Sequence, residues 1–321
     1  MKKALTHLVL IIGFVNSIIA DEVPIPSAIA VLGDSISEGM MTDYSLERPP
    51  SLFKVASLIN SVQSYTGLER MNFVRKVFAK KYHSWATGSD SSDYVFSHFE
   101  RLKTLSPELK GFNFAVSGSK TEDMKTQIDE LLETEQKENI LIDYILVLFG
   151  SNDLKSESVE TVVQPPTFAS NIEANVKRLL NINPRRNILL VGIPKIHDIM
   201  EKSQKYLVYN FFGKKIRCDG IRKSIYGNAV YFNPQDQESF NQSRMIAEMY
   251  RNEIDILADK LKAEYPLAHI KTVQNYDAPS LVFKSLSIDC FHPSTLGQAL
   301  LAEVTWIYGF WPELVTEEDY Q

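Results

Sequence analysis

Short apolar runs alternate along this chain with segments whose apolar residues recur at helical spacing. The runs cover residues 28–32, 112–116, 144–149, 187–193 and 268–273. Their apolar character is continuous rather than alternating, which is typical of strands buried on both faces. The helical spacing covers residues 71–81, 124–135, 168–182, 239–262 and 295–308. The alternation predicts an α/β fold, a three-layer α/β/α sandwich around a mainly parallel, five-stranded sheet.

Composition limits the classes of protein that this chain can belong to. It has 321 residues, 44% of them hydrophobic, and it contains no repeat or low-complexity block, so we expect one globular domain over residues 21–321. The net charge of −6 gives no support to a phosphate-neutralising surface. We therefore expect no nucleic-acid partner, and no feature predicts an obligate protein partner.

The N-terminus has the pattern of a secretory signal peptide. Lys2 and Lys3 precede an apolar stretch over residues 8–20, which is shorter than the ~20 residues that a membrane span needs. We place the signal peptide at residues 1–20; cleavage near Ser17 and an uncleaved membrane anchor are the alternatives. The protein is thus expected to be secreted or periplasmic.

Two cysteines, Cys218 and Cys290, lie in the part expected to be exported. In an oxidising compartment such a pair is readily joined as one disulfide, here between a mid-chain segment and a C-terminal one. Two free, buried thiols are the alternative interpretation.

Polar residues follow three of the expected strands. Ser35, Gly118 and Asn152 each come shortly after the end of an apolar run. In an open α/β sheet, ligands bind outside the carboxyl ends of the strands. The sequence therefore places these three residues at one edge of the sheet.

Ser35 is a candidate nucleophile, and a serine hydroxyl needs a base within hydrogen-bonding distance. Among the six histidines, only His292 has a carboxylate three residues before it, Asp289, which could orient the imidazole and stabilise its charged form. Taken singly, each of the three residues could be an ordinary turn or capping residue. Their joint occurrence favours acyl transfer through Ser35, His292 and Asp289.

Attack on an ester carbonyl places negative charge on its oxygen, so hydrogen-bond donors are needed. The candidates are the backbone N–H groups of Ser35 and Gly118 and the side-chain amide of Asn152. A simple turn glycine and a helix-capping asparagine are the alternatives. We expect Asp153 to order its loop by bonding backbone N–H groups, outside the catalytic set.

Two segments exceed a minimal α/β core, residues 40–68 and 195–236. The second is rich in Tyr, Phe and Lys. Either could form a lid or a substrate wall. The aromatic residues of the second segment could line an acyl channel or fill ordinary core, and we favour core; they are Tyr206, Tyr209, Phe211, Phe212 and Tyr226.

These residues occur in four blocks, and in their order the sequence resembles the GDSL or SGNH serine hydrolases. The blocks are Gly33-Asp34-Ser35, Gly118, the stretch from Gly150 to Asp153, and Asp289 with His292. The resemblance implies a flavodoxin-like three-layer fold, with Ser35 as nucleophile, Gly118 and Asn152 as oxyanion donors, His292 as base and Asp289 as its partner. It implies no metal and no cofactor.

Further segments look like the phospholipase B-like branch of that family. They are residues 84–88, 97–98, 116–119 and 289–294. Ile36 where the block usually has leucine, and Lys155 where animal members have cysteine, are departures that leave the substrate open. The branch implies hydrolysis of phospholipid or lysophospholipid acyl esters, with transient contact to a membrane surface. A short-chain or carbohydrate O-acetyl esterase, or an inactive lipid- or glycan-binding protein, are the alternatives.

Overall fold

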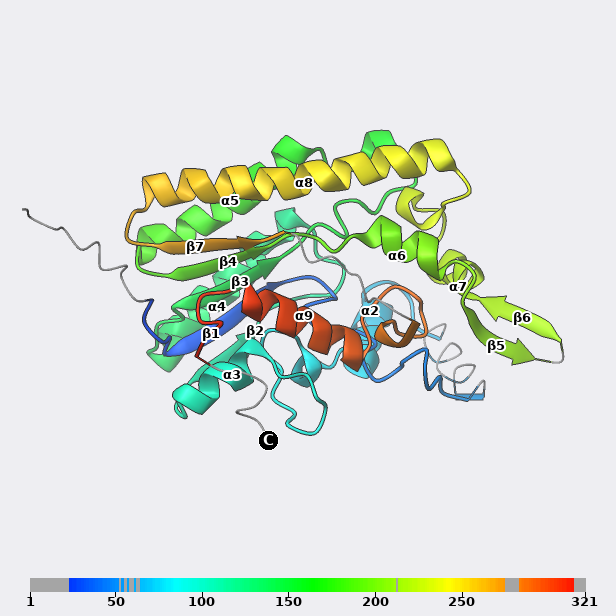
Figure 1. The fold of residues 1–321 in the computed structure, drawn as a ribbon, viewed down its shortest axis with the longest axis horizontal. Helices are drawn as coiled ribbons and strands as arrows, with labels where there is room; N and C mark the ends of the chain where they lie inside the picture. Colours follow the sequence, from blue (N-terminus) through cyan, green and yellow to red (C-terminus); the bar gives the residue numbers. More distant parts are fainter. Residues whose placement is uncertain are drawn as a thin grey trace, which may run out of the picture.

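The computed structural model describes residues 23–314, apart from 52, 55–56, 58–60, 62–63, 212 and 275–282. The expected signal peptide lies outside the described residues. The core is a five-stranded, fully parallel sheet in the order β2-β1-β3-β4-β7 (Figure 1). The strands are β1 (Ala28–Gly33), β2 (Lys110–Asn113), β3 (Tyr144–Leu148), β4 (Asn187–Val191) and β7 (His269–Val273). The predicted three-layer α/β fold is confirmed.

Helices cover both faces of the sheet. The described helices are α2 (Gly67–Phe78), α3 (His98–Leu105), α4 (Met124–Glu138), α5 (Pro165–Ile182), α6 (Ile196–Ser203), α7 (Cys218–Tyr226), α8 (Gln237–Glu264) and α9 (Thr295–Ile307). Short 3₁₀ turns lie at Lys81–His83, Thr121–Asp123, Val159–Thr161, Val230–Phe232 and Phe283–Ser285. α5 and α8 lie on one side of the sheet, and α3 and α9 lie on the other (Figure 1). Within the described residues, no helix is both long and apolar enough to cross a membrane.

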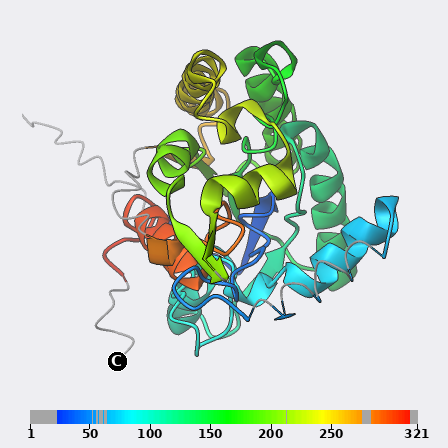
Figure 2. The same ribbon diagram turned by 90° about the vertical axis from the view of Figure 1, so that its right-hand side faces the viewer.

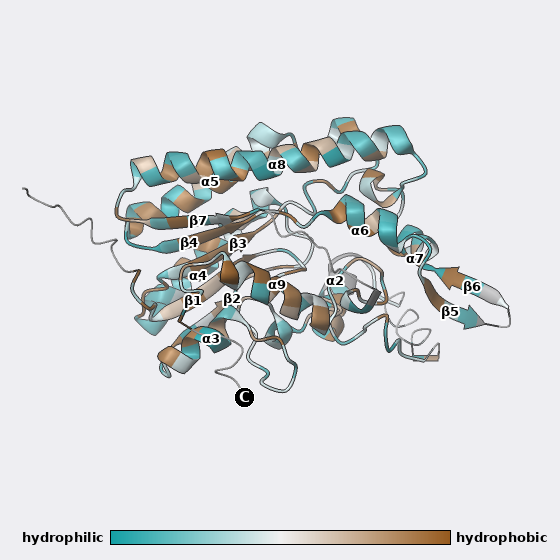
Figure 3. Cartoon of the chain, viewed as in Figure 1, coloured by the Kyte–Doolittle hydropathy of each residue, from teal (hydrophilic) through white to brown (hydrophobic). Residues whose placement is uncertain are grey.

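The continuous apolar runs are explained by burial on both faces. Alternate residues of a strand point to opposite sides of a sheet. In β1, Ala28, Ala30 and Leu32 pack into the cluster formed with α4, α5 and α8, and the two residues between them pack toward α3 and α9. Every residue of β1 is buried, and the hydrophobic strands stand out in Figure 3. No face of this strand is available for polar residues, so functional side chains come only after its end.

One strand differs from the sequence expectation. We expected it over residues 112–116, and β2 covers Lys110–Asn113. The parallel register pairs Val31 with Asn113, and the chain beyond keeps only single bonds to β1, from the N–H of Phe114 to Val31 and from that of Val116 to Gly33. Pairing with β1, rather than local hydrophobicity, fixes the bounds of β2.

The segment over residues 195–236 forms a structure of its own beyond the carboxyl edge of the sheet. After α6, the antiparallel strands β5 (Leu207–Phe211) and β6 (Lys214–Arg217) form a hairpin that leads into α7. The hairpin projects away from the body of the protein in Figure 1, and it faces the viewer in Figure 2. Of the other long segment, residues 40–68, only part is described.

Candidate active site

The topology of the sheet brings the expected site residues together. β1 lies between β2 and β3, and these three strands are followed by Ser35, Gly118 and Asn152. Gly33, at the end of β1, is needed because a Cβ there would lie 2.7 Å from both the Leu148 carbonyl oxygen and Ser37 Oγ. The chain can therefore turn closely enough to hold Ser35 at the carboxyl edge.

Ser35, His292 and Asp289 form a continuous hydrogen-bonded chain. His292 Nε2 lies 2.8 Å from Ser35 Oγ, and His292 Nδ1 lies 2.5 Å from Asp289 Oδ2. The three residues are buried, with 2 to 6% of their surface exposed. The distance between Ser35 Oγ and His292 Nε2 is within the range for proton transfer between a nucleophile and a base. The arrangement can activate the Ser35 hydroxyl and stabilise the resulting imidazolium.

The turn that carries His292 is built around the Asp289 carboxylate. Asp289 Oδ1 accepts the backbone N–H groups of Phe291 and His292, each at 3.1 Å. Burial raises the pKa of this carboxyl, but the attraction of His292 and hydrogen bonds from His292, Tyr226 and Phe291 outweigh it, so the pKa lies below the usual value. Asp289 is thus ionised and held in place.

Tyr226 also belongs to this group, a role that its sequence context does not indicate. Its hydroxyl donates to Asp289 Oδ2 at 2.7 Å and lies 3.3 Å from His292 Nδ1. Tyr226 comes from α7, more than sixty residues before the turn, so no local pattern could indicate the contact. Of the other aromatic residues in that segment, Tyr209 donates to the Pro50 carbonyl, and Phe212 lies outside the described residues.

The three candidate oxyanion donors lie on the loops after β1, β2 and β3. Within the described part of the chain, the backbone N–H groups of Ser35 and Gly118 donate no hydrogen bond. Gly118 has φ +88°, and the space in which a Cβ would stand is open. The Asn152 amide donates to the Ser119 carbonyl at 3.0 Å. Because a primary amide has two hydrogens, this bond can orient Asn152 and leave its second N–H for an oxyanion.

Buried polar contacts fix the loop that carries Gly118. Glu38 Oε2 accepts the N–H of Ser117 at 2.8 Å and also binds its hydroxyl, while Glu38 Oε1 accepts two bonds from Arg75. Glu38 is 1% exposed and lies three residues after Ser35. One carboxylate therefore ties the loop after β2 to the turn after β1. Preorganised donors of this kind are what stabilisation of an oxyanion requires.

Asp153 links the loops after β2 and β3. Its carboxylate accepts the N–H of Thr121 at 3.2 Å and the Thr121 hydroxyl at 2.6 Å. Burial raises the pKa of Asp153 to about 6. Its bonds are those of a residue that orders a loop, and it has no bond to Ser35 or His292 among the described contacts.

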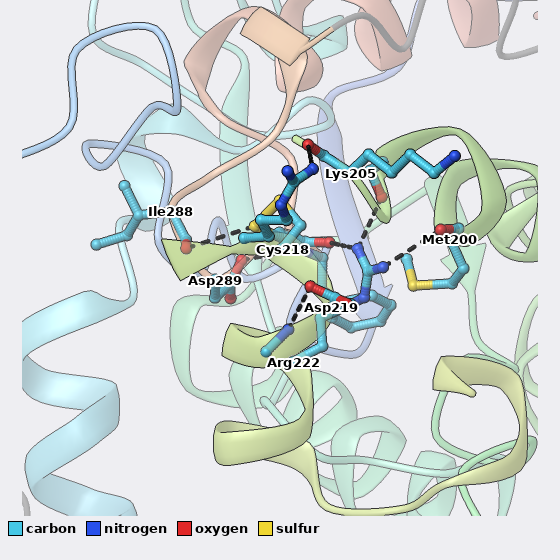
Figure 4. The surroundings of a disulfide bond; sticks show 12 residues. Met200, Lys205, Cys218, Asp219, Arg222, Ile288 and Asp289 are labelled. Carbon is cyan, nitrogen blue, oxygen red and sulfur yellow. Dashed lines mark hydrogen bonds between the residues drawn. A yellow bond between two sulfur atoms is a disulfide. The ribbon is translucent and has the colours of Figure 1, made fainter. Parts of the chain in front are cut away.

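A disulfide attaches α7 to the turn that carries His292. Cys218 begins α7, and Cys290 directly follows Asp289; their Cα atoms are 5.4 Å apart (Figure 4). Buried Arg222 adds bonds from α7 to the Cys290 carbonyl at 3.2 Å and to Ser203 Oγ at 2.7 Å. The projecting segment and the site are thus one covalently joined unit.

Replacing both cysteines is expected to lower stability. The bridge closes a loop with a sequence separation of 72 residues, and the loop-entropy relation then gives a loss of about 4 kcal/mol in the free energy of unfolding. Chemical denaturation of Cys218→Ala/Cys290→Ala under oxidising conditions measures this loss. As a control, the variant and the parent are compared in reductant, where the disulfide is absent from both. Equal stability of the two proteins under oxidising conditions would contradict the expectation.

Asp34 is a completely buried carboxyl beside the candidate nucleophile. Its Oδ1 accepts the Ile36 N–H at 2.9 Å, and its Oδ2 has no hydrogen-bond partner among the described residues. Burial is the largest cause of a pKa raised to about 7; nearby Asp153 and Glu38 raise it further, and His292 lowers it. Asp34 is therefore protonated in mildly acidic solution.

This raised pKa predicts a stability that falls as the pH rises. The folded chain holds the Asp34 proton up to about pH 7, whereas the unfolded chain releases it near the ordinary value of 3.8. Asp34 therefore contributes most to the free energy of unfolding below about pH 3.8. Up to about 4 kcal/mol of this contribution is lost as the pH rises through about 7. Asp34→Asn, which keeps the acceptor for Ile36, should flatten the change in unfolding free energy between about pH 4 and pH 8. Exposed Asp255→Asn is the control; an unchanged slope in Asp34→Asn would contradict this prediction.

One cluster of possible metal ligands occurs in the described residues, formed by His83, Asp90 and Asp93. Both ring nitrogens of His83 are hydrogen-bonded, Nδ1 to Asp93 and Nε2 to Asp43 at 2.9 Å. Burial lowers the pKa of His83, but the bonds to the two carboxylates outweigh it and raise the pKa to about 9. A protonated imidazole has no free lone pair for a metal, so the cluster has the chemistry of an ion pair.

The chain matches a known protein family over most of its length. Residues 29–305 match the family described as GDSL-like Lipase/Acylhydrolase, a range that includes Ser35, Gly118, Asn152, Asp289 and His292. The chain belongs to this family. The phospholipase B-like branch is not resolved by the match, and a search of curated proteins found no match.

Solved structures similar to this GDSL hydrolase include TesA, an acetylxylan esterase and an alpha/beta hydrolase. TesA is 13% identical, with 90% of this chain and 99% of that chain covered and a TM-score of 0.48. Axe2, an acetylxylan esterase from Geobacillus stearothermophilus, is 15% identical, with 91% and 95% covered and a TM-score of 0.43. LAE5, an alpha/beta hydrolase from the metagenome of Lake Arreo, is 13% identical, with 90% and 97% covered and a TM-score of 0.45. At these identities the substrates of those proteins do not transfer to this chain.

Proposed function

We propose that this GDSL-type ester hydrolase is an exported serine esterase that cleaves the acyl esters of phospholipids or lysophospholipids through an acyl-enzyme. The observation that carries the proposal is the hydrogen-bonded chain from Ser35 Oγ to His292 and from His292 to Asp289. Export is supported by the signal-peptide pattern and by the disulfide, because disulfides persist in oxidising compartments.

In the first step Ser35 Oγ attacks the carbonyl carbon of the ester, and His292 Nε2 takes its proton. The carbonyl oxygen becomes an oxyanion, held by the N–H groups of Ser35 and Gly118 and by the Asn152 amide. Asp289 keeps the proton on His292 Nδ1 and stabilises the imidazolium. When the tetrahedral intermediate collapses, the C–O bond to the alcohol breaks, and His292 returns the proton to the leaving oxygen.

Water completes the cycle by the same route. His292 takes a proton from water, the hydroxide attacks the acyl carbon, and the fatty acid leaves as Ser35 recovers its proton. Ser35 and His292 are thus both restored at the end of the cycle.

Aromatic side chains next to the His292 imidazole support the proposal that the substrate carries an acyl chain. The Phe291 ring lies edge-on to His292 at 4.9 Å between centroids, and it contacts Tyr226 at 5.5 Å and Phe232 at 5.1 Å. Phe291 and Tyr226 are partly exposed. Apolar surface next to a catalytic histidine favours a substrate with a hydrocarbon part.

Removal of the Asn152 amide is expected to slow turnover and leave substrate binding largely intact. Loss of one oxyanion donor costs about 10²–10³ in kcat, because the bond is strongest in the transition state. Steady-state kinetics of Asn152→Ala on a chromogenic ester measures it. Asn72→Ala, on the exposed face of α2, is the matched control, and a rise in KM at constant kcat would contradict the oxyanion role.

The test of the function is release of fatty acid from phosphatidylcholine and lysophosphatidylcholine, beside a short-chain chromogenic ester. The purified mature chain and Ser35→Ala are assayed in parallel with a chelator present. Lipid turnover that survives the chelator and disappears in Ser35→Ala is the expected result. Activity on the short ester alone would replace the lipid assignment by a small-acyl one, and absence of any Ser35-dependent activity would favour a binding protein.

A further inference from the structure

The segment from Lys202 to Tyr226, which we name the basic hairpin, differs in charge from the rest of the chain. It contains seven Lys and Arg residues and one acidic residue, Asp219. The whole chain, by contrast, has 40 acidic and 34 basic residues. The segment includes β5, β6 and α7 and projects from the body of the protein (Figure 1). Positive charge is therefore concentrated on one protrusion of an acidic protein.

The charges of the basic hairpin are available to a partner. Five of its cations are exposed and form no ion pair with any described residue: Lys202, Lys205, Lys215, Arg217 and Lys223. Elsewhere, several cations are neutralised by carboxylates, as when Lys177 binds Glu173 and Glu264. Arg222 is buried and has an internal role. The unneutralised charge favours an anionic partner.

Apolar side chains accompany these cations. Leu207 on β5 is 42% exposed, and Ile225 on α7 is 55% exposed. Figure 3 shows hydrophobic and hydrophilic residues side by side on β5 and β6. Nucleic acids and sulfated glycans present charge with little hydrocarbon, whereas a lipid surface presents anionic headgroups above an apolar interior. The combination therefore favours a lipid surface.

The basic hairpin is attached to the candidate active site at both ends of α7. Cys218 is bonded to Cys290, next to Asp289, and the Tyr226 hydroxyl donates to Asp289 itself. A surface that binds the hairpin is therefore held beside Ser35 and His292.

We propose that the basic hairpin docks this protein on an anionic phospholipid surface. The inference rests on the proposed function, because a lipid esterase finds its substrate at such a surface. Each lysine near an anionic bilayer adds about fivefold to the affinity, and the attraction weakens as salt screens it. The exposed aliphatic residues then enter the interfacial region.

The experiment separates binding from turnover. The mature chain carrying Ser35→Ala is sedimented with vesicles of phosphatidylcholine, or of phosphatidylcholine mixed with phosphatidylglycerol. Three double variants are compared in that background: Lys205→Gln/Lys215→Gln on the hairpin, Leu207→Ser/Ile225→Ser on the same segment, and Lys103→Gln/Lys137→Gln as the control. The control lysines are exposed and outside any described ion pair, and they lie near the ends of α3 and α4, at the opposite edge of the sheet. Thermal unfolding verifies that all variants are folded.

We expect binding to the mixed vesicles only, a loss of about twentyfold in the lysine pair on the hairpin, a smaller loss in the aliphatic pair and none in the control. Equal loss in the two lysine pairs, equal binding to neutral vesicles, or no binding at all would overturn the inference. The inference would also be overturned if heparin competed with the vesicles for the protein and the aliphatic double variant bound as strongly as the parent. That result would favour a soluble polyanion as the partner. Vesicle binding without lipid hydrolysis by the parent enzyme would reject the proposed function alone, while hydrolysis of monomeric lysophospholipid without vesicle binding would reject only the docking.

Discussion

Ser35→Ala is expected to abolish ester hydrolysis, with a fall of about 10⁶ in kcat. The reason is that the hydroxyl 2.8 Å from His292 Nε2 is the group that forms the covalent intermediate. Loss of the nucleophile of a triad removes nearly all the catalysis that the three residues provide together, and the remaining rate comes from oxyanion donors and binding. Turnover of a chromogenic ester gives the magnitude.

A covalent probe makes this test independent of the natural substrate. A fluorophosphonate reacts with an activated serine, so it should label the parent protein at Ser35 and fail to label Ser35→Ala or His292→Ala. Ser224→Ala, an exposed serine on α7, is the matched control and should be labelled like the parent. Labelling of the Ser35→Ala protein at another serine would reject Ser35 as nucleophile.

Asp289→Asn is expected to lower kcat by about 10⁴ with little change in the fold. An asparagine amide facing Nδ1 favours the wrong tautomer of His292 and removes the charge that stabilises the imidazolium. The carbonyl oxygen of the new amide can still accept the backbone bonds that Asp289 Oδ1 accepts from Phe291 and His292. Kinetics measured beside thermal unfolding separates the catalytic effect from misfolding; parallel losses of activity and stability would contradict it.

Tyr226→Phe removes one hydrogen bond to the Asp289 carboxylate and keeps the carboxylate itself. Its hydroxyl is one of the donors that lower the pKa of Asp289, so its removal should cost about tenfold in kcat, as expected for a hydrogen bond to a charged group. The pH profile of kcat should also shift, which a merely structural effect would not cause. Tyr94→Phe, at a side chain that is 93% exposed, is the control.

The sequence by itself determined the sheet and most of the site. Continuous apolar runs such as residues 28–32 predicted strands buried on both faces, and the carboxyl ends of such strands meet at one edge. This placed Ser35, Gly118 and Asn152 near one another before any contact was known. The contact between Asp289 and His292 was also foreseeable, because it lies within one turn.

Only the tertiary structure decided the contacts between distant segments. Tyr226 reaches Asp289 because a disulfide holds α7 against the C-terminal turn, and Glu38 reaches Ser117 across two loops. Packing also decides that Asp34 Oδ2 has no hydrogen-bond partner among the described residues. It likewise decides that β2 ends at Asn113. A pattern of hydrophobicity depends only on residues that are neighbours in the chain, so it can be recognised from the sequence. A hydrogen bond between residues far apart in the chain depends on how whole elements pack, and no local pattern contains that information.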